Sequence, residues 1–427
     1  LTPAVVRSCP LLEDAKAGEA RQPSKEKRLQ SDNWRQMSRP FSLHGSVQLT
    51  EHDWVLLLRT TSNGEALLSA LSSCAISAID PQLLQVRRSF ELAHTRQITD
   101  LQPFTLNPSL FATASQDGSA RVWDLRSPSG GPQAEYRLTP NRTDAEVYSC
   151  SVGADDALLA CGLGPEVKSF DLRTGKPVLT YESHSDIVNC VRFHPLERHV
   201  LLSAGDDNLI CMNDTRVADE EEACVSVINN EDNVRGFTII GPQAEVLCAI
   251  STTDDVTLWG LRGCNKIAEL KTIRSHPLLQ AEDSAGYIVD CFWEQTGQTL
   301  FVLAGSSFGH LLLFEATEAG AVPSVSFVNE SALGTGHTAV VRSAVSCAGP
   351  EGAGAASLLT GGEDGLVCKW APQKLMEPQQ QQQPGGTEMA TASGVSTSSP
   401  SGCLDLHNTH VSARIQNSRR QRAAGPY

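Results

Sequence analysis

The chain has 427 residues, of which 40% are hydrophobic and 19% are charged, and its formal net charge is -15 at pH 7. This composition is ordinary for a folded globular protein, and no run reaches the roughly 18 uncharged apolar residues needed to span a bilayer. The first residues also lack the basic-then-apolar pattern of a signal peptide. The sequence therefore predicts an intracellular protein, in the nucleus, the cytoplasm or both, and no membrane association.

Acidic residues are concentrated in the central part of the chain. Residues 41–372 hold 21 Lys and Arg against 41 Asp and Glu, whereas residues 1–40 and 373–427 are slightly basic. An acidic surface repels the phosphates of nucleic acids. Direct nucleic-acid binding by this part of the chain is therefore disfavoured, and a basic protein partner is the easier expectation.

The 13 cysteines are scattered along the chain and include no C-x-x-C pair. Most of them lie within apolar strand patterns, where a free cysteine behaves as a small hydrophobic residue. Their spacing fits neither a disulfide framework nor a zinc site. We therefore expect a reducing compartment, no metal and no cofactor.

Three regions follow one another along the chain. Residues 1–40 are polar and mixed in charge, which predicts a disordered N-terminal arm. The middle region is residues 41–372. It begins with residues 41–49, which alternate apolar and polar side chains, as one strand would. Residues 373–427 open with a run of glutamines and continue rich in Ser, Thr and Gly, which predicts a low-complexity disordered tail.

The region 41–372 contains one pattern repeated seven times: two short β-rich runs separated by a turn. The last residue of each repeat, which corresponds to Asp124 in the pair Trp123-Asp124, serves as its marker. The intervals between markers are 44, 47, 43, 46, 55 and 56 residues. The first four match the roughly 40–45 residues of a propeller blade, and the last two are lengthened by loops at residues 274–286 and 316–336. The markers are Asp80, Asp124, Asp171, Asp214, Gly260, Glu315 and Ala371. The fold class is thus all-β, a seven-bladed propeller over 41–372 between two disordered arms.

Closure of the ring requires a further strand. The last blade lacks a fourth strand after Trp370, because the chain then enters the low-complexity tail. We infer that residues 41–49 supply it and latch the N-terminus to the seventh blade. Blades 1 and 6, which have Ile79 and Phe314 in place of a tryptophan, are expected to be the least regular.

The repeats carry a recognisable motif. An Asp-Gly turn is followed by Trp-Asp in the segment 115–126, and the turn and tryptophan recur in 363–370. These segments resemble the WD40 repeat family, in which a histidine, the turn aspartate, a strand Ser or Thr and the tryptophan form a buried hydrogen-bond set. The matching residues are His94, Asp117 and Trp123 in blade 2, His337, Asp364 and Trp370 in blade 7, and His184 and Asp207 in blade 4.

Within the family, the order of the segments 184–195, 286–314 and 336–370 resembles one group of poorly defined function. A second motif, Asp-x-Arg, ends three successive blades at Arg126, Arg173 and Arg216. It resembles the signature by which WD40 substrate receptors dock on the adaptor of cullin-4 ubiquitin ligases. The alternative is a local salt bridge that tightens the turn.

The resemblance implies a non-catalytic scaffold for protein–protein interactions, acting as a monomeric propeller within a larger complex. The alternatives are a cullin-4 substrate receptor and a nuclear ribosome-assembly or chromatin-associated factor. An enzyme is not expected, because the sequence shows no cluster of carboxylates and histidines for the axis of the propeller. Recognition is expected on the top face, whose candidate rim residues are Arg96, Asp186, Arg235, Tyr287 and Thr338.

Overall fold

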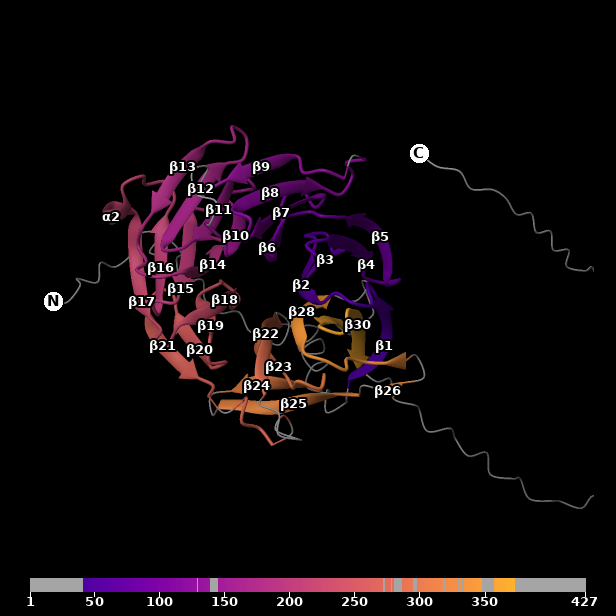
Figure 1. Cartoon of the computed structure of the whole chain (residues 1–427). Coiled ribbons are helices and arrows are strands. Elements are labelled where there is room, and N and C mark those ends of the chain that lie inside the picture. The colour runs from indigo at the N-terminus through magenta and orange to yellow at the C-terminus, as the bar shows by residue number, and fades with distance from the viewer. Residues whose placement is uncertain are drawn as a thin grey trace, which may run out of the picture. The chain divides into compact units, whose positions relative to one another are not determined.

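A computed structural model describes residues 41–128, 130–138, 145–271, 273–277, 279, 286–294, 298–317, 320–328, 330–331, 334–347 and 357–372. The two arms expected to be disordered, 1–40 and 373–427, lie outside these residues. The described part of the chain forms a seven-bladed β-propeller around a central axis (Figure 1). The predicted fold class is therefore confirmed.

Each blade is built from antiparallel strands that follow one another outward from the axis. Blade 1 contains β2 (Val55–Thr60), β3 (Leu67–Leu71), β4 (Ile76–Asp80) and β5 (Gln85–Phe90), and blade 2 contains β6 (Ile98–Pro103), β7 (Leu110–Ser115), β8 (Ser119–Asp124) and β9 (Ala134–Arg137). Blade 3 contains β10 (Ser149–Gly153), β11 (Leu158–Leu163), β12 (Glu166–Asp171) and β13 (Pro177–Tyr181). Blade 4 contains β14 (Val188–Phe193), β15 (Val200–Gly205), β16 (Leu209–Asp214) and β17 (Cys224–Asn229), with the short helix α2 (Glu220–Ala223) before its last strand.

The remaining blades complete the circle. Blade 5 contains β18 (Val234–Ile240), β19 (Val246–Ser251), β20 (Val256–Gly260) and β21 (Asn265–Glu269). Blade 6 contains β22 (Tyr287–Glu294), β23 (Thr299–Gly305), β24 (Leu311–Thr317) and β25 (Gly320–Val328). Blade 7 contains β28 (Val341–Cys347), β29 (Ser357–Gly362), β30 (Leu366–Pro372) and, from the other end of the described chain, β1 (Phe41–Gln48), and a small hairpin of β26 (Glu330–Ser331) and β27 (Gly334–Thr335) precedes it.

Burial follows the position of a strand within its blade. The second strands β3, β15 and β29 are buried at every residue, because the neighbouring blades cover both faces of the sheet. The outermost strand β21 instead alternates between exposed and half-buried residues. Continuous apolar runs therefore mark inner strands and alternating runs mark outer ones.

The ring closes through β1. This strand pairs antiparallel with β30, where Leu43 lies opposite Trp370, and it also pairs in parallel with β25, where Phe41 lies opposite Phe327. Phe41 and Leu43 are each only 2% exposed and pack in one hydrophobic cluster with Trp370. The predicted latch is confirmed, and it fastens blade 6 as well as blade 7.

The expectation of irregular blades is half right. Blade 6 departs from the others because β25 joins β1, which merges blades 6 and 7 into one eight-stranded sheet. For blade 1 the expectation is wrong, since its four strands form a separate sheet like those of blades 2 to 5. Ile79 stands at the tryptophan position there and is completely buried, so aliphatic packing replaces the polar set.

We predict that the latch is a main determinant of stability. Leu43→Ala should lower the free energy of unfolding by about 2–5 kcal/mol, because it opens a cavity beside Trp370 in a site that cannot collapse freely. The adjacent exposed His44 provides the control, and His44→Ala should change it by less than about 0.5 kcal/mol. Urea unfolding followed by tryptophan fluorescence measures both, and equal midpoints would contradict the prediction.

Candidate functional site

The innermost strands share a one-residue register shift near their start. In β14, Val188 pairs with Gly205 and Cys190 with Ala204, which leaves Asn189 outside the ladder. The same shift occurs in the first strands of blades 1, 2, 5, 6 and 7. A β-bulge of this kind bends the strand and redirects a side chain.

The bulges place one residue from each blade around the axis. In blade 3, which lacks the shift, Tyr148 takes the corresponding place just before β10. We call this set the axial ring: Leu56, Thr99, Tyr148, Asn189, Arg235, Val289 and Arg342. All of its members line the axial cavity, of about 480 Å³, or the mouth of that cavity, of about 670 Å³.

Three axial-ring side chains also tie their blade to the next one. The Thr99 hydroxyl donates to the carbonyl of Val147 at 2.7 Å, and the Asn189 amide donates to the carbonyl of Val234 at 3.1 Å. Arg235 donates to the carbonyl of Ile288 at 2.9 Å. Each acceptor belongs to the blade that follows. The ring therefore contributes hydrogen bonds between adjacent blades and also lines the axial cavity.

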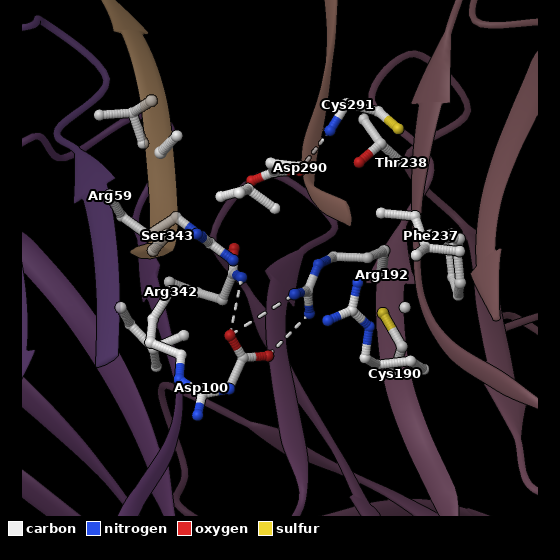
Figure 2. A pocket seen from close by; sticks show the side chains of 18 of the residues that line it. Arg59, Asp100, Cys190, Arg192, Phe237, Thr238, Asp290, Cys291, Arg342 and Ser343 are labelled. Atoms are coloured by element: carbon white, nitrogen blue, oxygen red, sulfur yellow. Dashed lines mark hydrogen bonds and ion pairs between the residues drawn. The ribbon is translucent and has the colours of Figure 1, made fainter. Parts of the chain in front are cut away.

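A buried ion pair crosses the cavity wall below the ring (Figure 2). Arg192 of blade 4 donates through Nη1 to Asp100 of blade 2 at 2.8 Å, and the Ser149 hydroxyl of blade 3 donates to the same carboxylate at 2.7 Å. Burial acts most strongly on the pKa of Asp100 and raises it, but the charges of Arg192 and Arg59 and the hydrogen bonds outweigh burial. The pKa of Asp100 therefore lies below its ordinary value, and three blades share one charged centre.

Two further charged groups of the cavity have few contacts. Arg59 donates from Nη1 to the carbonyl of its neighbour Leu58 at 2.8 Å, and Asp290 accepts the N–H of its neighbour Cys291 at 2.8 Å. Burial raises the pKa of Asp290, although the charges of Arg59, Arg235 and Arg192 act in the opposite direction. Among the described residues, neither Arg59 nor Asp290 forms an ion pair with another blade.

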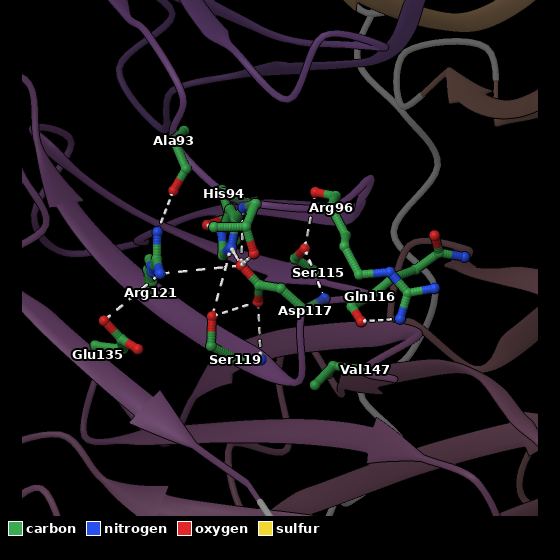
Figure 3. Close-up of polar contacts among 12 residues, drawn as sticks. Ala93, His94, Arg96, Ser115, Gln116, Asp117, Ser119, Arg121, Glu135 and Val147 are labelled. Carbon is green, nitrogen blue, oxygen red and sulfur yellow. Dashed lines mark hydrogen bonds and ion pairs between the residues drawn. The ribbon is translucent and has the colours of Figure 1, made fainter. Parts of the chain in front are cut away.

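The predicted histidine sets come together in blades 2 and 7. His94 Nδ1 lies 3.0 Å from Asp117 and its Nε2 lies 2.7 Å from the Thr113 hydroxyl, which also accepts the Trp123 indole N–H at 2.9 Å. Because a carboxylate only accepts, Nδ1 carries the proton and Nε2 accepts from Thr113. Figure 3 shows His94 and Asp117 with Ser119, whose hydroxyl donates to the same carboxylate at 2.6 Å.

Blade 7 repeats this geometry, and blade 4 keeps part of it. His337 lies 3.0 Å from Asp364 and 2.8 Å from Thr360, which accepts the Trp370 indole N–H at 2.7 Å. His184 lies 3.0 Å from Asp207 and 2.9 Å from Ser203. These histidine side chains are fully buried within their blades. The sets satisfy buried polar groups, and among the described residues no cluster of His, Cys, Asp and Glu suits a metal.

The Asp-x-Arg arginines lie at the ends of the third strands of blades 2, 3 and 4, on the face opposite the mouth. Arg126 donates through Nε and Nη2 to the two oxygens of Asp124, both at 3.0 Å, and Arg216 engages Asp214 in the same way at 2.9 and 2.6 Å. The Arg126 side chain is nevertheless 67% exposed, and that of Arg216 is 50% exposed. Arg173 is exposed too, and none of the described carboxylates lies within 4.0 Å of it.

The candidate rim residues do not converge. Only Arg235 lines the cavity and its mouth. Arg96 donates to the carbonyl of Gln116 at 3.0 Å (Figure 3) and forms an ion pair with Glu146 at 2.8 Å. Asp186 and Thr338 are exposed. Tyr287 is half-buried, and its hydroxyl accepts the N–H of Val341 at 2.7 Å, so it joins blades 6 and 7 rather than facing a partner.

The sequence interpretation missed most of the axial ring and every charged residue below it. A signal was present: each ring residue directly follows a buried Val or Ile at the start of an innermost strand, as Asn189 follows Val188. Most residues at the ring position, such as Arg342, and most of those three positions further along the chain, such as Arg59, line the cavity. The seven aliphatic residues are Val55, Ile98, Val147, Val188, Val234, Ile288 and Val341.

We predict that Asp100 makes stability depend on pH in acid. Because its pKa in the folded state lies below the unfolded value of about 3.9, its contribution is complete above about pH 4 and is lost as the pH falls through the folded value. Asp100→Asn should reduce stability at pH 7, and its difference from the wild type should shrink on acidification.

Ser149→Ala is the matched control, because it removes a hydrogen bond to the same carboxylate while both charges remain. It should keep most of the wild-type pH slope. Free energies of unfolding from denaturant titrations at several pH values measure all three proteins. A wild-type slope in Asp100→Asn would refute the role of this carboxylate.

Comparison with known proteins agrees with this architecture. A family model described as WD domain, G-beta repeat matches residues 85–124 and 175–214. The chain is 30% identical over 342 residues to WD repeat-containing protein GTS1 of Arabidopsis thaliana, covering 77% of this chain and 84% of that protein. It is 30% identical over 141 residues to WD repeat and SOCS box-containing protein 1 of Danio rerio, covering 33% of this chain and 32% of the relative.

The group that the segments 184–195, 286–314 and 336–370 resemble is that of WD repeat-containing protein 89. A homolog of that protein from Dictyostelium discoideum is 28% identical to the chain over 246 residues, which cover 56% of this chain and 63% of the relative. None of the described helices is long and apolar enough to cross a membrane. Together with the seven blades and the histidine sets, these likenesses show that the chain belongs to the WD40 repeat family.

Proposed function

We propose that this protein is a non-catalytic scaffold that holds a protein partner at the mouth of its axial cavity, within an intracellular complex. The observation that carries the proposal is the axial ring itself. All seven blades contribute a ring side chain to the axial cavity or to its mouth, so the fold concentrates different chemical groups where no individual blade could. Such a ring suits recognition of a polypeptide segment.

Trp54 adds an anchor beside this opening. It lines the mouth and is 46% exposed, whereas its neighbour Val55, the first residue of β2, is completely buried. Tryptophan and arginine are the residue types most often found at the energetic centre of protein interfaces. Trp54 lies close to the mouth-lining Arg342 in the wall of one opening, which supports a binding role for this face.

The same geometry argues against catalysis. The histidines and turn aspartates that resemble catalytic pairs are buried inside separate blades. In the cavity, Asp100 is engaged by Arg192 and Ser149. No described histidine lines the axial cavity to serve as a base. Propellers of this family generally act as interaction domains, and we assign this chain the same role.

We predict that Trp54→Ala releases partners bound at the mouth. Affinity purification from nuclear and cytoplasmic extracts, followed by mass spectrometry, should recover a partner set with the wild type and about tenfold less with the variant, a loss of about 1.4 kcal/mol. Leu196→Ala, at a 64% exposed site on the opposite face, should retain the partners. An unchanged partner set in Trp54→Ala would overturn the proposal, and ribosome-assembly or chromatin proteins in the set would identify a nuclear complex.

A cullin-4 substrate receptor is the second candidate. The supporting observation is that Arg126, Arg173 and Arg216 lie at corresponding places on three consecutive blades and are exposed on one face. Arginine forks pair well with carboxylates of a partner. One relative carries both WD repeats and a SOCS box in its name. We keep this function as an alternative that uses a different face from the first.

The alternative predicts that the ligase adaptor co-purifies with the chain. Replacing Arg126, Arg173 and Arg216 together by alanine should lower its recovery about tenfold or more. Arg137→Ala is the control, because Arg137 is 63% exposed on an outer strand away from that face. Adaptor recovery that is the same in both variants would rule out docking through these arginines.

A further inference from the structure

The axial cavity reverses the charge balance of the rest of the propeller. Residues 41–372 contain nearly twice as many acidic as basic residues. The cavity lining instead contains four arginines and two aspartates, contributed by six different blades. These are Arg59, Arg192, Arg235 and Arg342, with Asp100 and Asp290. Figure 2 shows all of them except Arg235 with labels. A basic partner suits the acidic outer surface, but the excess of arginines in the cavity lining favours an acidic group.

The four arginines differ in whether they form an ion pair with a carboxylate. Arg192 is paired with Asp100, Arg235 with Asp254 at 3.2 Å, and Arg342 with Glu363. Arg59 alone among them has no carboxylate of the described residues within 4.0 Å. A guanidinium has five N–H donors, and the described contacts of Arg59 use one of them, on the Leu58 carbonyl.

Arg59 is therefore the arginine of the cavity lining that has no carboxylate partner among the described residues. It is half-buried, and its charge reaches across the cavity, since it contributes to the pKa values of both Asp100 and Asp290. In a recess with protein walls, such a charge attracts anions more strongly than it does on an open surface. A fork with free donors also binds a carboxylate in a defined orientation.

The mouth is large enough for a chain to reach this group. It encloses about 670 Å³ and shares Leu57, Thr99, Tyr148, Asn189, Arg235 and Arg342 with the cavity of about 480 Å³ beneath it. The two spaces are thus continuous. A peptide that contacts Trp54 at the mouth has a path lined by Arg235 and Arg342 toward Arg59.

We propose that the axial cavity receives a glutamate or aspartate side chain from an extended acidic segment of a partner protein, with Arg59 as its ion-pair partner. This inference rests on the proposed scaffold function and names the chemistry of the occupant. A carboxylate is favoured over a phosphate because Asp100 and Asp290 share the cavity and repel a dianion more strongly than a monoanion.

The test uses the purified full chain and a fluorescein-labelled peptide of six glutamates, with peptides of six lysines and of alternating glycine and serine for comparison. Fluorescence polarisation should show saturable binding of the glutamate peptide that weakens with salt, and none of the other two. Arg59→Gln should weaken binding about tenfold or more, and Arg137→Gln should not. Preferred binding of the lysine peptide, or equal binding to Arg59→Gln, overturns the proposal.

A second variant guards against loss of binding through misfolding. Asp290→Asn removes a negative charge from the cavity without breaking any described ion pair, so it should strengthen binding of the glutamate peptide about threefold or more. Unfolding cannot produce such a gain. Unchanged or weaker binding in a variant that melts like the wild type contradicts the proposal.

Two further comparisons define the occupant and separate this inference from the scaffold function. Inorganic phosphate that displaces the glutamate peptide at lower concentration than acetate would make phosphate the preferred anion and refute a carboxylate site. The peptide assay needs no cellular partner. If Trp54→Ala loses its partners while Arg59→Gln binds the glutamate peptide normally, the scaffold function stands and the acidic occupant fails.

Discussion

A blade of this propeller cannot be stable by itself, because both faces of its inner strands are apolar and need a neighbour on each side. Seven blades in a row would still leave the first and the last with one uncovered face. The contact between β1 and β30 removes both ends at once, and the parallel pairing of β1 with β25 extends the closure to blade 6. Burial of Phe41 and Leu43 against Trp370 is therefore the interaction on which the cover of every other blade depends.

Closure also creates the candidate site. Only a closed ring brings the seven innermost strands around one axis, and only the bulges at their starts turn residues such as Asn189 and Arg342 toward the mouth. The cost is that polar groups and charges lie where the surroundings are largely protein. Hydrogen bonds from ring residues to the next blade offset part of the unfavourable free energy of removing these groups from water, and the ion pair of Asp100 with Arg192 offsets another part. The site is thus made of the same contacts that keep adjacent blades in register.

The sequence was sufficient for the fold and for only part of the site. Seven recurring turns and the Trp-Asp pair predict the propeller, because each repeat indicates its own local structure. Tyr287 was placed on an open rim because its position along the chain suggested it, but its hydroxyl serves the backbone of Val341 in another blade. Arg59 and Asp290 could not be predicted to share a cavity, since their proximity arises from ring closure and from bulges that shift the strand pleat by one residue. Net charge gives no information about the cavity, because it averages the whole chain with a lining that contains four arginines and two aspartates.

The arginines on the two faces of the propeller differ in whether they already have a carboxylate partner, and this difference bears on which face binds an anion more strongly. Arg126 and Arg216 already direct their forks at Asp124 and Asp214, so a partner that takes those donors must replace an ion pair that exists in the free protein. Such an exchange gains little, because an exposed ion pair is screened by solvent and the old contact is lost as the new one forms. Arg59 has no such pair to give up, and around its half-buried side chain a new pair is screened less than on an open surface. An anionic side chain therefore gains more at the axis than at the ends of the blades, which favours the mouth as the principal binding surface of this propeller.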